Sequence, residues 1–524
     1  MAEQTVLSNT KISLSSASMS DPSALPLLHF FVAFLLLCIL SFAFLKKRYS
    51  RLRLPPGPPG LPILGHLHKL SLDPHKSLQS LSRTYGPLLF LKFGSLPVIV
   101  VSSPEMAKNI LQKQDQNFAW RSPFVVHRVL HKYPTIAGSQ PDPAWRSIRQ
   151  ICATQLFAPT KLKSFQPIIL EEIRSLLRSI DADGHQKSCV RSKLHAASIN
   201  IISRMTLGNK LQMNESNSAA NASAHLTNLL VESIELSGFF NLSDYVPWLA
   251  WMDLQGCERK SKALGGKLQK VWTEIIDERR QYRNIVCPER EDTDFLDILL
   301  SAFEIKDPPL EYEKIAPILY DIFAGGTDTS AITVEWALAE LISHPSKMKR
   351  VQDEIDEVVG NSRLVEPEDV QNMPYFQAVI KETMRLHPLL PFLVPHMAKA
   401  ECRVEDFDIP ANALTLINVW AIGRDEKVWG SALDFSPERF LGSDIDVRGR
   451  HFELLPFGSG RRACPGMLLG IINVNLMLAC LRQAFVFEPN ERLDKTEKFG
   501  IVMALANPLL IRASPRVPIH LLLE

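Results

Sequence analysis

The sequence predicts a mainly α-helical protein with a small β part, preceded by one membrane-spanning helix. Apolar residues recur with helical spacing along most of the chain, and only three short runs have the pattern of strands. With 524 residues, of which 46% are hydrophobic, the chain can bury a large core. One stretch near the N-terminus differs from the rest because it is apolar throughout and uncharged.

The expected elements follow from this spacing. Helices are predicted over residues 104–112, 161–180, 264–283, 330–343, 346–359, 375–386 and 467–485. Strands are predicted over residues 88–93, 97–101 and 414–419. Residues 214–223, which are rich in Asn, Ser and Ala, are expected to form a surface loop.

Residues 27–45 have the composition of a transmembrane helix. At about 1.5 Å per residue this stretch spans roughly 28 Å, close to the thickness of one bilayer core. Basic residues follow it directly: Lys46, Lys47, Arg48, Arg51 and Arg53. They place the C-terminal side in the cytosol by the positive-inside rule. A cleaved signal peptide has its basic cluster before the apolar stretch, so a retained anchor is the prediction.

The sequence therefore divides into four parts. Residues 1–26, polar and rich in serine, are predicted to be disordered. Residues 27–45 form the anchor, 46–60 a basic and proline-rich hinge, and 61–524 the globular body. The prolines of the hinge exclude a helix or a central strand. The body contains no second linker, internal repeat or low-complexity block.

The composition argues against several classes of protein. A formal net charge of +2 gives no sign of a nucleic-acid partner. The eight cysteines include no C-x-x-C pair, which is typical of a reducing compartment rather than a disulfide framework. The motifs H-E-x-x-H and G-x-x-x-x-G-K-[ST] are both missing, so zinc-protease and nucleotide-loop chemistry lack support.

The loop that contains Cys464 carries the strongest chemical signal. Residues 457–466 have the sequence Phe-Gly-Ser-Gly-Arg-Arg-Ala-Cys-Pro-Gly, and a long apolar helix is expected to follow, with Pro465 as its first residue. Neighbouring arginines and the positive end of that helix favour a thiolate, which is a metal ligand or a nucleophile. A buried structural cysteine is the alternative that this loop alone leaves open.

The string F-x-x-G-x-R-x-C-x-G resembles the haem-binding loop of the cytochrome P450 family. Residues 391–396 and 324–330 resemble the plant microsomal A-type branch of that family. The resemblance covers nearly all of the body and implies a single fold built around haem b. It also implies that Cys464 is the axial ligand of the iron and that Phe457 and Arg462 contact the haem.

Residues 324–330, Ala-Gly-Gly-Thr-Asp-Thr-Ser, lie within an apolar stretch over residues 315–341. Two adjacent glycines cost a helix roughly 1 kcal/mol each relative to alanine, and they open it where another group approaches closely. A kink with a satisfied threonine is the simpler interpretation. The string matches the family's oxygen-activation motif, which implies that Thr329 hydrogen-bonds dioxygen and that Asp328 helps to deliver protons. Pro317, two turns upstream, is expected to kink or shorten this helix.

Two further motifs have a structural meaning in the family. Glu382 and Arg385 stand three residues apart on one face of a predicted helix, and Arg439 lies in the string Pro-Glu-Arg-Phe. An exposed pair of this kind would contribute little. The resemblance implies instead that the three side chains form a buried network beneath the haem loop.

Four residues are expected to bind the haem propionates. Trp145 and Arg149 are one helical turn apart, and the family pattern adds Arg462 and His396. A planar guanidinium can bind a carboxylate through two hydrogen bonds. An amphipathic helix with an arginine that reaches solvent is the alternative for the first two residues.

The resemblance implies a monooxygenase that inserts one oxygen atom of O₂ into a hydrophobic small molecule. The chain has no flavin or nucleotide motif, so electrons from NADPH would arrive through a membrane-bound cytochrome P450 reductase at the endoplasmic reticulum. An oxygen-independent isomerase or dehydratase and a non-catalytic haem sensor are the competing hypotheses. Asp328 and Thr329 favour the monooxygenase.

The expected substrate pocket is apolar. By family position it is lined by residues 118–134, 239–251, 389–394 and 501–505 and by the helix before Gly325. Such a pocket suits a hydrophobic ligand. Residues 251–256 resemble both flavonoid hydroxylases and in-chain fatty-acid hydroxylases. A phenylpropanoid or flavonoid-type aromatic is the predicted substrate, with a fatty acid or a terpenoid as the alternative.

Overall fold

The structure is a computed structural model that describes residues 52–131, 133–184, 186–210, 218–286, 294–305, 311–489 and 493–517. The predicted disordered segment and the predicted anchor lie outside the described residues. One described helix, α20 (Met467–Ala484), is long and apolar enough to cross a membrane. However, 67% of it is buried inside the fold, as expected for a core helix.

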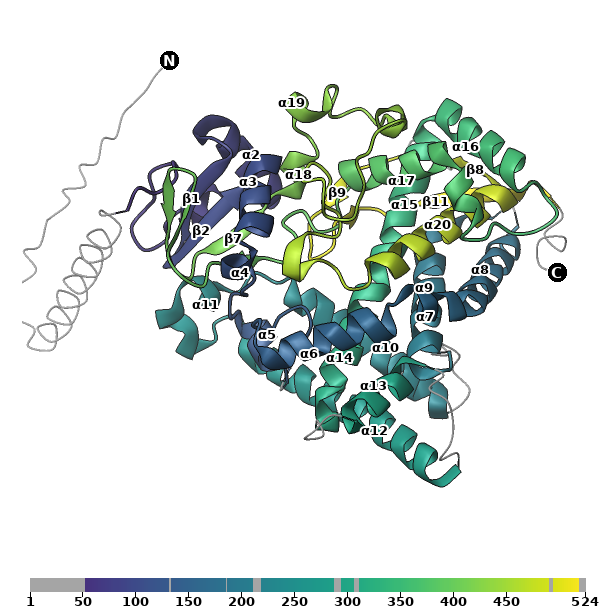
Figure 1. Ribbon diagram of the computed structural model, residues 1–524, viewed down its shortest axis with the longest axis horizontal. Helices are drawn as coiled ribbons and strands as arrows, with labels where there is room; N and C mark the ends of the chain where they lie inside the picture. The colour runs from purple at the N-terminus through teal and green to yellow at the C-terminus, as the bar shows by residue number, and fades with distance from the viewer. Residues whose placement is uncertain are drawn as a thin grey trace, which may run out of the picture. The chain divides into compact units, whose positions relative to one another are not determined.

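The described body is mainly helical, as predicted. Figure 1 places the sheet of β1, β2 and β7 at one end of the body, beside α2 and α3. The helices are α2 Pro74–Tyr85, α3 Pro104–Lys108, α4 Asp115–Phe118, α5 Val125–Leu130, α6 Pro143–Ile151, α7 Pro159–Ser164, α8 Gln166–Asp181, α9 Val190–Leu207, α10 Ser218–Ser237, α11 Leu242–Tyr245, α12 Cys257–Val286, α13 Phe295–Glu304, α14 Ala316–Gly326, α15 Asp328–Ser343, α16 Pro345–Val358, α17 Pro374–Leu386, α18 Val419–Ile422, α19 Glu426–Trp429 and α20.

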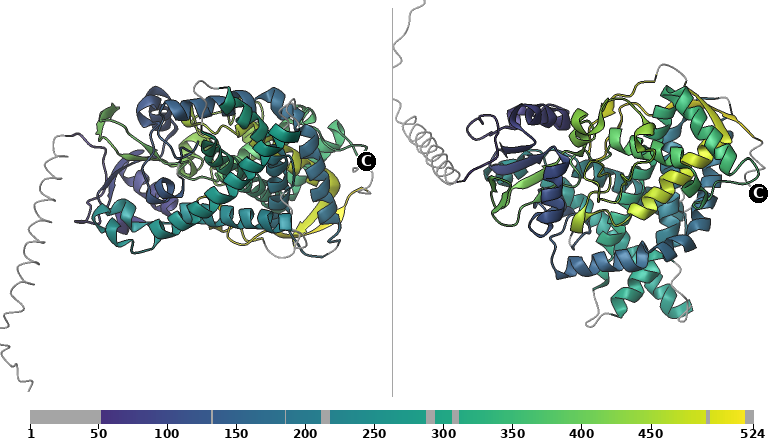
Figure 2. Two further views of the ribbon diagram at one scale, coloured as in Figure 1. Left: turned by 90° about the horizontal axis from the view of Figure 1, so that it is seen from below. Right: turned by 45° about the horizontal axis from the view of Figure 1, so that its top comes forward.

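The described strands form small sheets with the orders β1-β2-β7-β4, β3-β11-β8, β10-β9 and β5-β6. Both views in Figure 2 keep β1 and β2 (purple) at the end of the body opposite the strands near the C-terminus (yellow). The strands are β1 Leu88–Phe93, β2 Leu96–Val101, β3 Ser188–Cys189, β4 His396–Met397, β5 Cys402–Val404, β6 Phe407–Ile409, β7 Leu414–Ile417, β8 Phe485–Pro489, β9 Glu497–Lys498, β10 Ala504–Leu505 and β11 Leu510–Pro515.

The turn between β1 and β2 requires glycine. Gly94 has a φ of +59°, and a Cβ there would lie 2.1 Å from the carbonyl oxygen of Tyr245. The N–H of Ser95 donates to the same carbonyl at 2.9 Å. β2 then pairs in parallel with β7, and β7 pairs antiparallel with β4. This sheet therefore fixes His396, the first residue of β4.

Helix α15 lies in the centre of the helical region. Its residues from Ser330 to Ile342 are buried, and it packs against α9, α17 and α20. A helix that is buried on all sides is typical of a protein core. The N-terminal turn of α15, which carries Asp328 and Thr329, is consequently held by a rigid support.

Two predicted helices are interrupted. Residues 161–180 form α7 and α8, which meet at Phe165, because Pro167 occupies the first turn of α8, where a missing N–H costs nothing. Residues 104–112 form α3 followed by a π-helical turn, η2 (Asn109–Lys113). Four other predicted helices are present with ends shifted by at most two residues, whereas α12 begins seven residues earlier than predicted, at Cys257.

The helix predicted over residues 315–341 is divided at Thr327 into α14 and α15. The prediction that Pro317 kinks or shortens this helix is wrong, since α14 begins at Ala316, next to the predicted start, and the proline lies in its first turn. The prediction of a loop over residues 214–223 is wrong for residues 218–223, because α10 begins at Ser218.

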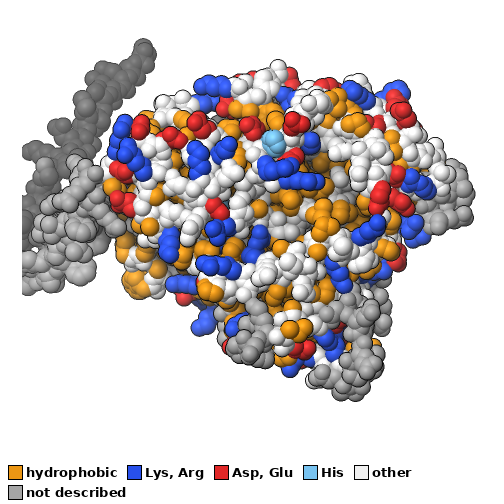
Figure 3. Space-filling view, viewed as in Figure 1, with side chains coloured by type: hydrophobic (Ala, Val, Ile, Leu, Met, Phe, Trp, Pro, Cys, Tyr) orange, Lys and Arg blue, Asp and Glu red, His pale blue; other side chains and the backbone are white. Residues whose placement is uncertain are grey.

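The proline-rich run is extended and lies against β1. The N–H of Phe90 donates to the carbonyl of Pro56 at 3.1 Å, and a ring nitrogen of His66 lies 2.8 Å from the carbonyl of Pro58. On the face in Figure 3, basic and acidic side chains are interspersed. That face therefore has no continuous basic stripe of the kind that binds nucleic acid.

Candidate functional site

A cavity of about 370 Å³ lies between α14, α15, α20 and the loop of Cys464. This volume is in the range of small-molecule sites. Cys464 and Thr329 both line it, although they are far apart in the sequence. Much of its wall is apolar, including Ile202, Ile234, Ile322, Leu389, Leu390, Leu393, Leu469, Ile501 and Val502.

One of the segments predicted to line the pocket does not reach it. Residues 239–251 contribute nothing to the cavity wall, and Ile234 and Ser237 of α10 take that place. The chain turns outward after α10, so Phe239 is 53% exposed and Trp251 is 82% exposed. The other four predicted segments do contribute lining residues.

Cys464 presents its accessible surface to this cavity. Pro465 was predicted to be the first residue of the following helix. This prediction is wrong, because Gly466 is the N-cap of α20 and the helix begins at Met467. Burial raises the pKa of the Cys464 thiol, while the N–H of Gly466 and the charge of Arg149 lower it. The predicted preference for a thiolate is therefore wrong for the chain alone. A metal ion bound to the sulfur would deprotonate it outright.

Arg149 lies close to Cys464. Its Nη2 donates to the carbonyl of Ala463 at 2.8 Å, so helix α6 is tied to the cysteine loop. Arg461, also expected near the sulfur, points outward and pairs with Asp115 at 3.1 Å. The helix that carries Arg149 thus supplies the cation that the loop was expected to provide.

Arg462 and Trp145 lie against each other. The guanidinium of Arg462 stacks 4.2 Å from the centre of the Trp145 ring, and its Nε donates to the carbonyl of Ala119 at 2.7 Å. The indole N–H of Trp145 donates to the carbonyl of Ile136 at 2.9 Å. The structure therefore brings Trp145, Arg149 and Arg462 to one side of the cavity.

Arg121 is a third guanidinium at this wall, and the sequence reasoning missed it. Its Nη1 donates to the carbonyls of Val394 and Pro395 at 2.8 and 2.9 Å. Burial, together with repulsion from Arg462 and Arg149, holds its pKa well below the usual value. The signal in the sequence was an arginine that directly follows the apolar run Phe-Ala-Trp.

These three arginines provide a test of whether haem fits. None of them forms an ion pair with a carboxylate of the described residues. Buried cations without an anion are unfavourable unless a ligand supplies one. The two propionates of haem b would supply that charge, and Cys464 faces the same cavity. The residues present fit the cofactor.

His396 and Phe457 also line the cavity. His396 Nδ1 donates to the carbonyl of Phe118 at 2.8 Å, and burial together with the charge of Arg121 lowers its pKa to about 3. The neutral ring then has only a lone pair at Nε2, so contact with a carboxylate needs a second proton. Phe457 packs beside Gly470, where a Cβ would lie 3.5 Å from the phenyl ring.

Thr329 and Asp328 point in different directions. The Thr329 hydroxyl lines the cavity and donates to the carbonyl of Gly325 at 2.7 Å. Asp328 does not line the cavity, and its carboxylate lies 3.2 Å from Nδ1 of His195 on α9. His195 was not predicted from the sequence, because the contact joins two separate helices.

The two glycines before Thr329 have different environments. A Cβ at Gly325 would meet no atom within 4 Å, whereas one at Gly326 would lie 2.5 Å from Cδ1 of Ile202. Only Gly325 therefore leaves open space next to the helix. Gly326 instead permits close packing between α14 and α9.

We expect opposite effects from alanine at these positions. Gly325→Ala stabilises the helix by about 0.5–1 kcal/mol but weakens ligand binding, since the methyl group enters the cavity. Gly326→Ala destabilises the fold by about 1 kcal/mol through its clash with Ile202, and Ile202→Val relieves part of that clash by removing Cδ1. Urea unfolding and ligand dissociation constants measure both effects. Equal loss of stability at the two positions would contradict this assignment.

Glu382, Arg385 and Arg439 form the expected buried network. Arg385 Nε and Nη2 donate to the carboxylate of Glu382 at 2.7 and 2.8 Å, and both side chains are inaccessible to solvent. Arg439 Nε donates to the same carboxylate at 3.1 Å. Arg385 also donates to the carbonyls of Gly423 and Ala432. The network thus joins α17 to the segment before the cysteine loop.

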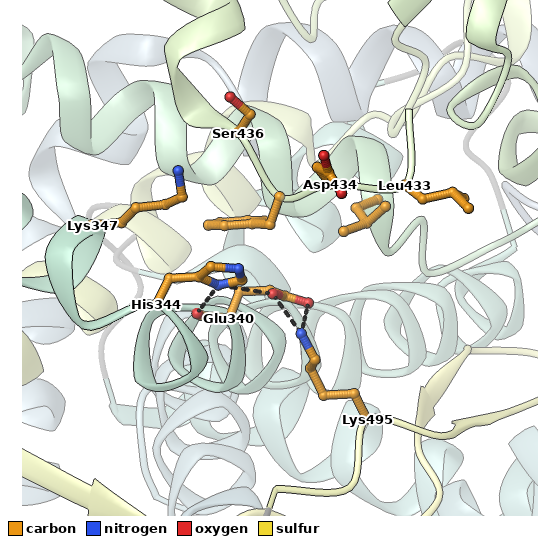
Figure 4. Close-up of a pocket in the computed structure, with 9 residues that line it drawn as sticks. Glu340, His344, Lys347, Leu433, Asp434, Ser436 and Lys495 are labelled. Carbon is orange, nitrogen blue, oxygen red and sulfur yellow. Dashed lines mark hydrogen bonds and ion pairs between the residues drawn. The ribbon is translucent and has the colours of Figure 1, made fainter. Parts of the chain in front are cut away.

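A second, polar depression lies at the C-terminal end of α15 (Figure 4). Glu340 accepts hydrogen bonds from Lys495 at 3.0 Å and from His387 at 2.8 Å. Burial raises the pKa of Glu340, but His387 and Lys495 together hold it below the usual value. The charges in this depression neutralise one another, so the apolar cavity is the candidate active site.

Among the described residues, no group of three His, Cys, Asp or Glu side chains could hold a metal ion. A metal bound at Cys464 therefore needs a cofactor that supplies its remaining ligands. Residues 55–512 match the family model described as Cytochrome P450. The chain belongs to the cytochrome P450 family. It is accordingly a haem-containing monooxygenase that uses O₂.

Plant proteins with similar sequences align with almost the whole length of this P450. It is 38% identical to Cytochrome P450 76C2 of Arabidopsis thaliana, over 93% of this chain and 97% of the relative. It is 36% identical to Flavonoid 3'-monooxygenase of Petunia hybrida, over 93% and 96%. It is 37% identical to Geraniol 8-hydroxylase of Catharanthus roseus, over 91% and 96%.

A solved structure confirms the fold. A zebra fish cytochrome P450, determined with abiraterone, superposes with a TM-score of 0.72 at 26% identity. The match covers 86% of this chain and all of the zebra fish chain. The mainly helical architecture with small sheets is therefore that of the P450 family.

Proposed function

We propose that this P450 hydroxylates a hydrophobic small molecule. One observation carries the proposal: Cys464 and Thr329 line the same cavity, and much of the wall of that cavity is apolar. An apolar ligand in this cavity would be held between the side that carries the cysteine and the side that carries the threonine. The proposed substrate is a phenylpropanoid or flavonoid-type aromatic, with a terpenoid or a fatty acid as the alternative.

The residues around Cys464 would hold the cofactor. Cys464 would provide the axial thiolate, while Arg121, Arg149 and Arg462 would bind the propionates and Trp145 would support Arg462. When bound, a thiolate-ligated haem supplies the oxidising chemistry, because the sulfur donates electron density that favours O–O cleavage. Phe457 and His396 would line the edge of this site.

Thr329 and Asp328 would transfer protons to the site of oxidation. Because the Thr329 hydroxyl donates to the carbonyl of Gly325, its oxygen remains free to accept a hydrogen bond within the cavity. Asp328 sits beside it in sequence but faces His195 outside the cavity. The carboxylate would accept protons on the outer side of the helix and pass them towards Thr329.

The electrons would come from NADPH through a membrane-bound cytochrome P450 reductase that docks near the cysteine loop. The apolar stretch over residues 27–45 and the basic residues after it support a single-pass anchor in the endoplasmic reticulum membrane, with the body in the cytosol. The relatives named above are plant P450s, which gives the same expectation.

Stoichiometry tests this function. The full-length protein is reconstituted with a P450 reductase and offered candidate aromatics and terpenoids. We expect one NADPH and one O₂ to be consumed for each hydroxylated product. Turnover of a peroxide substrate without reductase or O₂ would show an isomerase or dehydratase instead. Ligand binding without any turnover would indicate a sensor.

Thr329→Ala provides a sharper test of the proton role. We expect the product formed per NADPH to fall roughly 10-fold, less than the full effect of a general acid, because water can partly replace the hydroxyl. Thr327→Ala is the matched control, since its hydroxyl makes the same type of bond, to the carbonyl of Phe323 at 2.9 Å, outside the cavity. An unchanged ratio in Thr329→Ala would contradict the assignment.

A further inference from the structure

A group of polar side chains from α5, α10 and α14 lines the cavity. His127 of α5, His131 just after α5 and Tyr320 of α14 all line the cavity, as does Ser237 of α10. The rings of His131 and Tyr320 lie 4.4 Å apart. The Tyr320 hydroxyl lies 3.1 Å from the hydroxyl of Ser233. Three separate helical segments thus contribute to one polar patch in a largely apolar cavity.

The two imidazoles of this patch have no hydrogen-bond partner among the described residues. Burial lowers the pKa of His131 to about 3, with a further contribution from His127. Burial, followed by the charge of Arg121, also lowers the pKa of His127. Both rings are therefore neutral at neutral pH. Each has one N–H donor and one nitrogen acceptor available to a ligand.

Tyr320, which His131 contacts, is well separated from Thr329. Tyr320 precedes Thr329 by nine positions in α14 and α15, which corresponds to about 13 Å along the helix axis. A ligand that touches both ends is therefore elongated. Its polar group would lie at the end opposite the carbon that is oxidised.

We propose that His127 and His131 bind a hydroxyl group at the end of the substrate remote from Cys464. The orientation of this substrate rests on the hydroxylase function proposed above. A hydroxyl both donates and accepts one hydrogen bond, which matches a pair of neutral imidazoles. The Tyr320 ring and the apolar wall would contact the body of the molecule. An alcohol of the terpenoid type and a hydroxylated aromatic share this chemistry.

The surrounding charges disfavour a carboxylate at the same place. The nearby guanidinium of Arg121 donates to the carbonyls of Ala137, Val394 and Pro395, and the haem propionates would neutralise its charge, so it does not compensate a second carboxylate. Asp321, next to Tyr320, accepts the N–H groups of Ile136 and Ala137, and burial raises its pKa to about 7. A partly ionised Asp321 repels an anion, and an uncompensated buried carboxylate is costly. A fatty acid therefore fits this patch poorly.

Equilibrium dialysis of the full-length, haem-loaded protein in nanodiscs tests the proposal without reductase or NADPH. The probes are geraniol and its methyl ether, a monohydroxylated flavanone and its methyl ether, and dodecanol and lauric acid. We expect each hydroxylated probe to bind roughly 10-fold more tightly than its partner. Selectivity in only the geraniol pair or only the flavanone pair identifies which source of the hydroxyl the site accepts.

Variants show whether the two histidines cause the preference. The double variant His127→Leu/His131→Phe should lose it while binding the ethers as before, because His131→Phe keeps an aromatic ring against Tyr320. His131→Asn in the wild-type background restores a donor and an acceptor and should retain part of the preference. His68→Phe, at an exposed position, is the control and should change nothing.

The outcomes separate this inference from the proposed function. Equal binding of alcohols and ethers by the wild-type protein overturns the inference, as does a preference that survives in the folded double variant. If the double variant fails to fold, the wild-type ligand series still decides. Selective binding without hydroxylation in the reductase assay keeps the inference and refutes the proposed function. Hydroxylation without selective binding keeps the proposed function and refutes the inference.

Discussion

Cys464→Ser abolishes the thiolate-type absorption of the reduced, CO-bound protein and lowers hydroxylation by at least about 10²-fold, a loss typical of removing a strong catalytic interaction. Serine keeps the size and position of the side chain but is a far weaker electron donor than a thiolate. The absorption spectrum reports the ligand directly, and product formation with reductase reports the chemistry.

Cys402→Ser is the matched control for this experiment. Cys402 is a free, half-buried cysteine on β5 that does not line the cavity. Its replacement should leave both the spectrum and the activity near those of the wild type. A thiolate-type spectrum that persists in Cys464→Ser would refute the assignment of the axial ligand.

Arg385→Ala should destabilise the protein by about 3–5 kcal/mol, because it leaves the buried carboxylate of Glu382 without its main partner. Arg439 alone cannot compensate, since it contributes a single hydrogen bond to that carboxylate at 3.1 Å. Urea unfolding, followed by far-UV circular dichroism and by haem absorbance, measures the loss. We expect the haem signal to disappear at a lower urea concentration than in the wild type.

Lys349→Ala controls for the removal of any ion pair. Lys349 and Asp353 are 2.8 Å apart on the surface of α16, and both are more than half exposed. Such a pair contributes about 0.5 kcal/mol or less. A similarly small effect of Arg385→Ala would show that the buried network does not stabilise the fold.

Short sequence motifs allowed much of the site to be predicted. The cysteine loop, the Gly-Gly-Thr-Asp-Thr run and the Glu-x-x-Arg pair each place their side chains within one turn or one loop, so the spacing in the sequence is also a spacing in space. Helices with long apolar periodicity, such as α15 and α20, were predicted for the same reason.

The missed features depend on contacts between distant segments. His195 reaches the surroundings of the site only after two separate helices have packed together, and no local pattern marks that contact. Arg121 and His127 lie in the segment over residues 118–134 that was predicted to line the cavity, but their individual roles depend on contacts with distant segments. The thiol of Cys464 shows the same limit. Its neighbours in sequence suggested a lowered pKa, but burial by other elements raises it. The preference of Pro317 for a first helical turn was a local signal that received too little weight.

The three unpaired arginines have a consequence for the folded protein as a whole. Burial lowers the pKa values of Arg121 and Arg462, and repulsion from the neighbouring arginines lowers them further. A dianionic cofactor that binds only the folded state adds its binding free energy to the stability of that state. The yield of folded protein in a cell should therefore follow the supply of haem as well as the rate of synthesis of the chain.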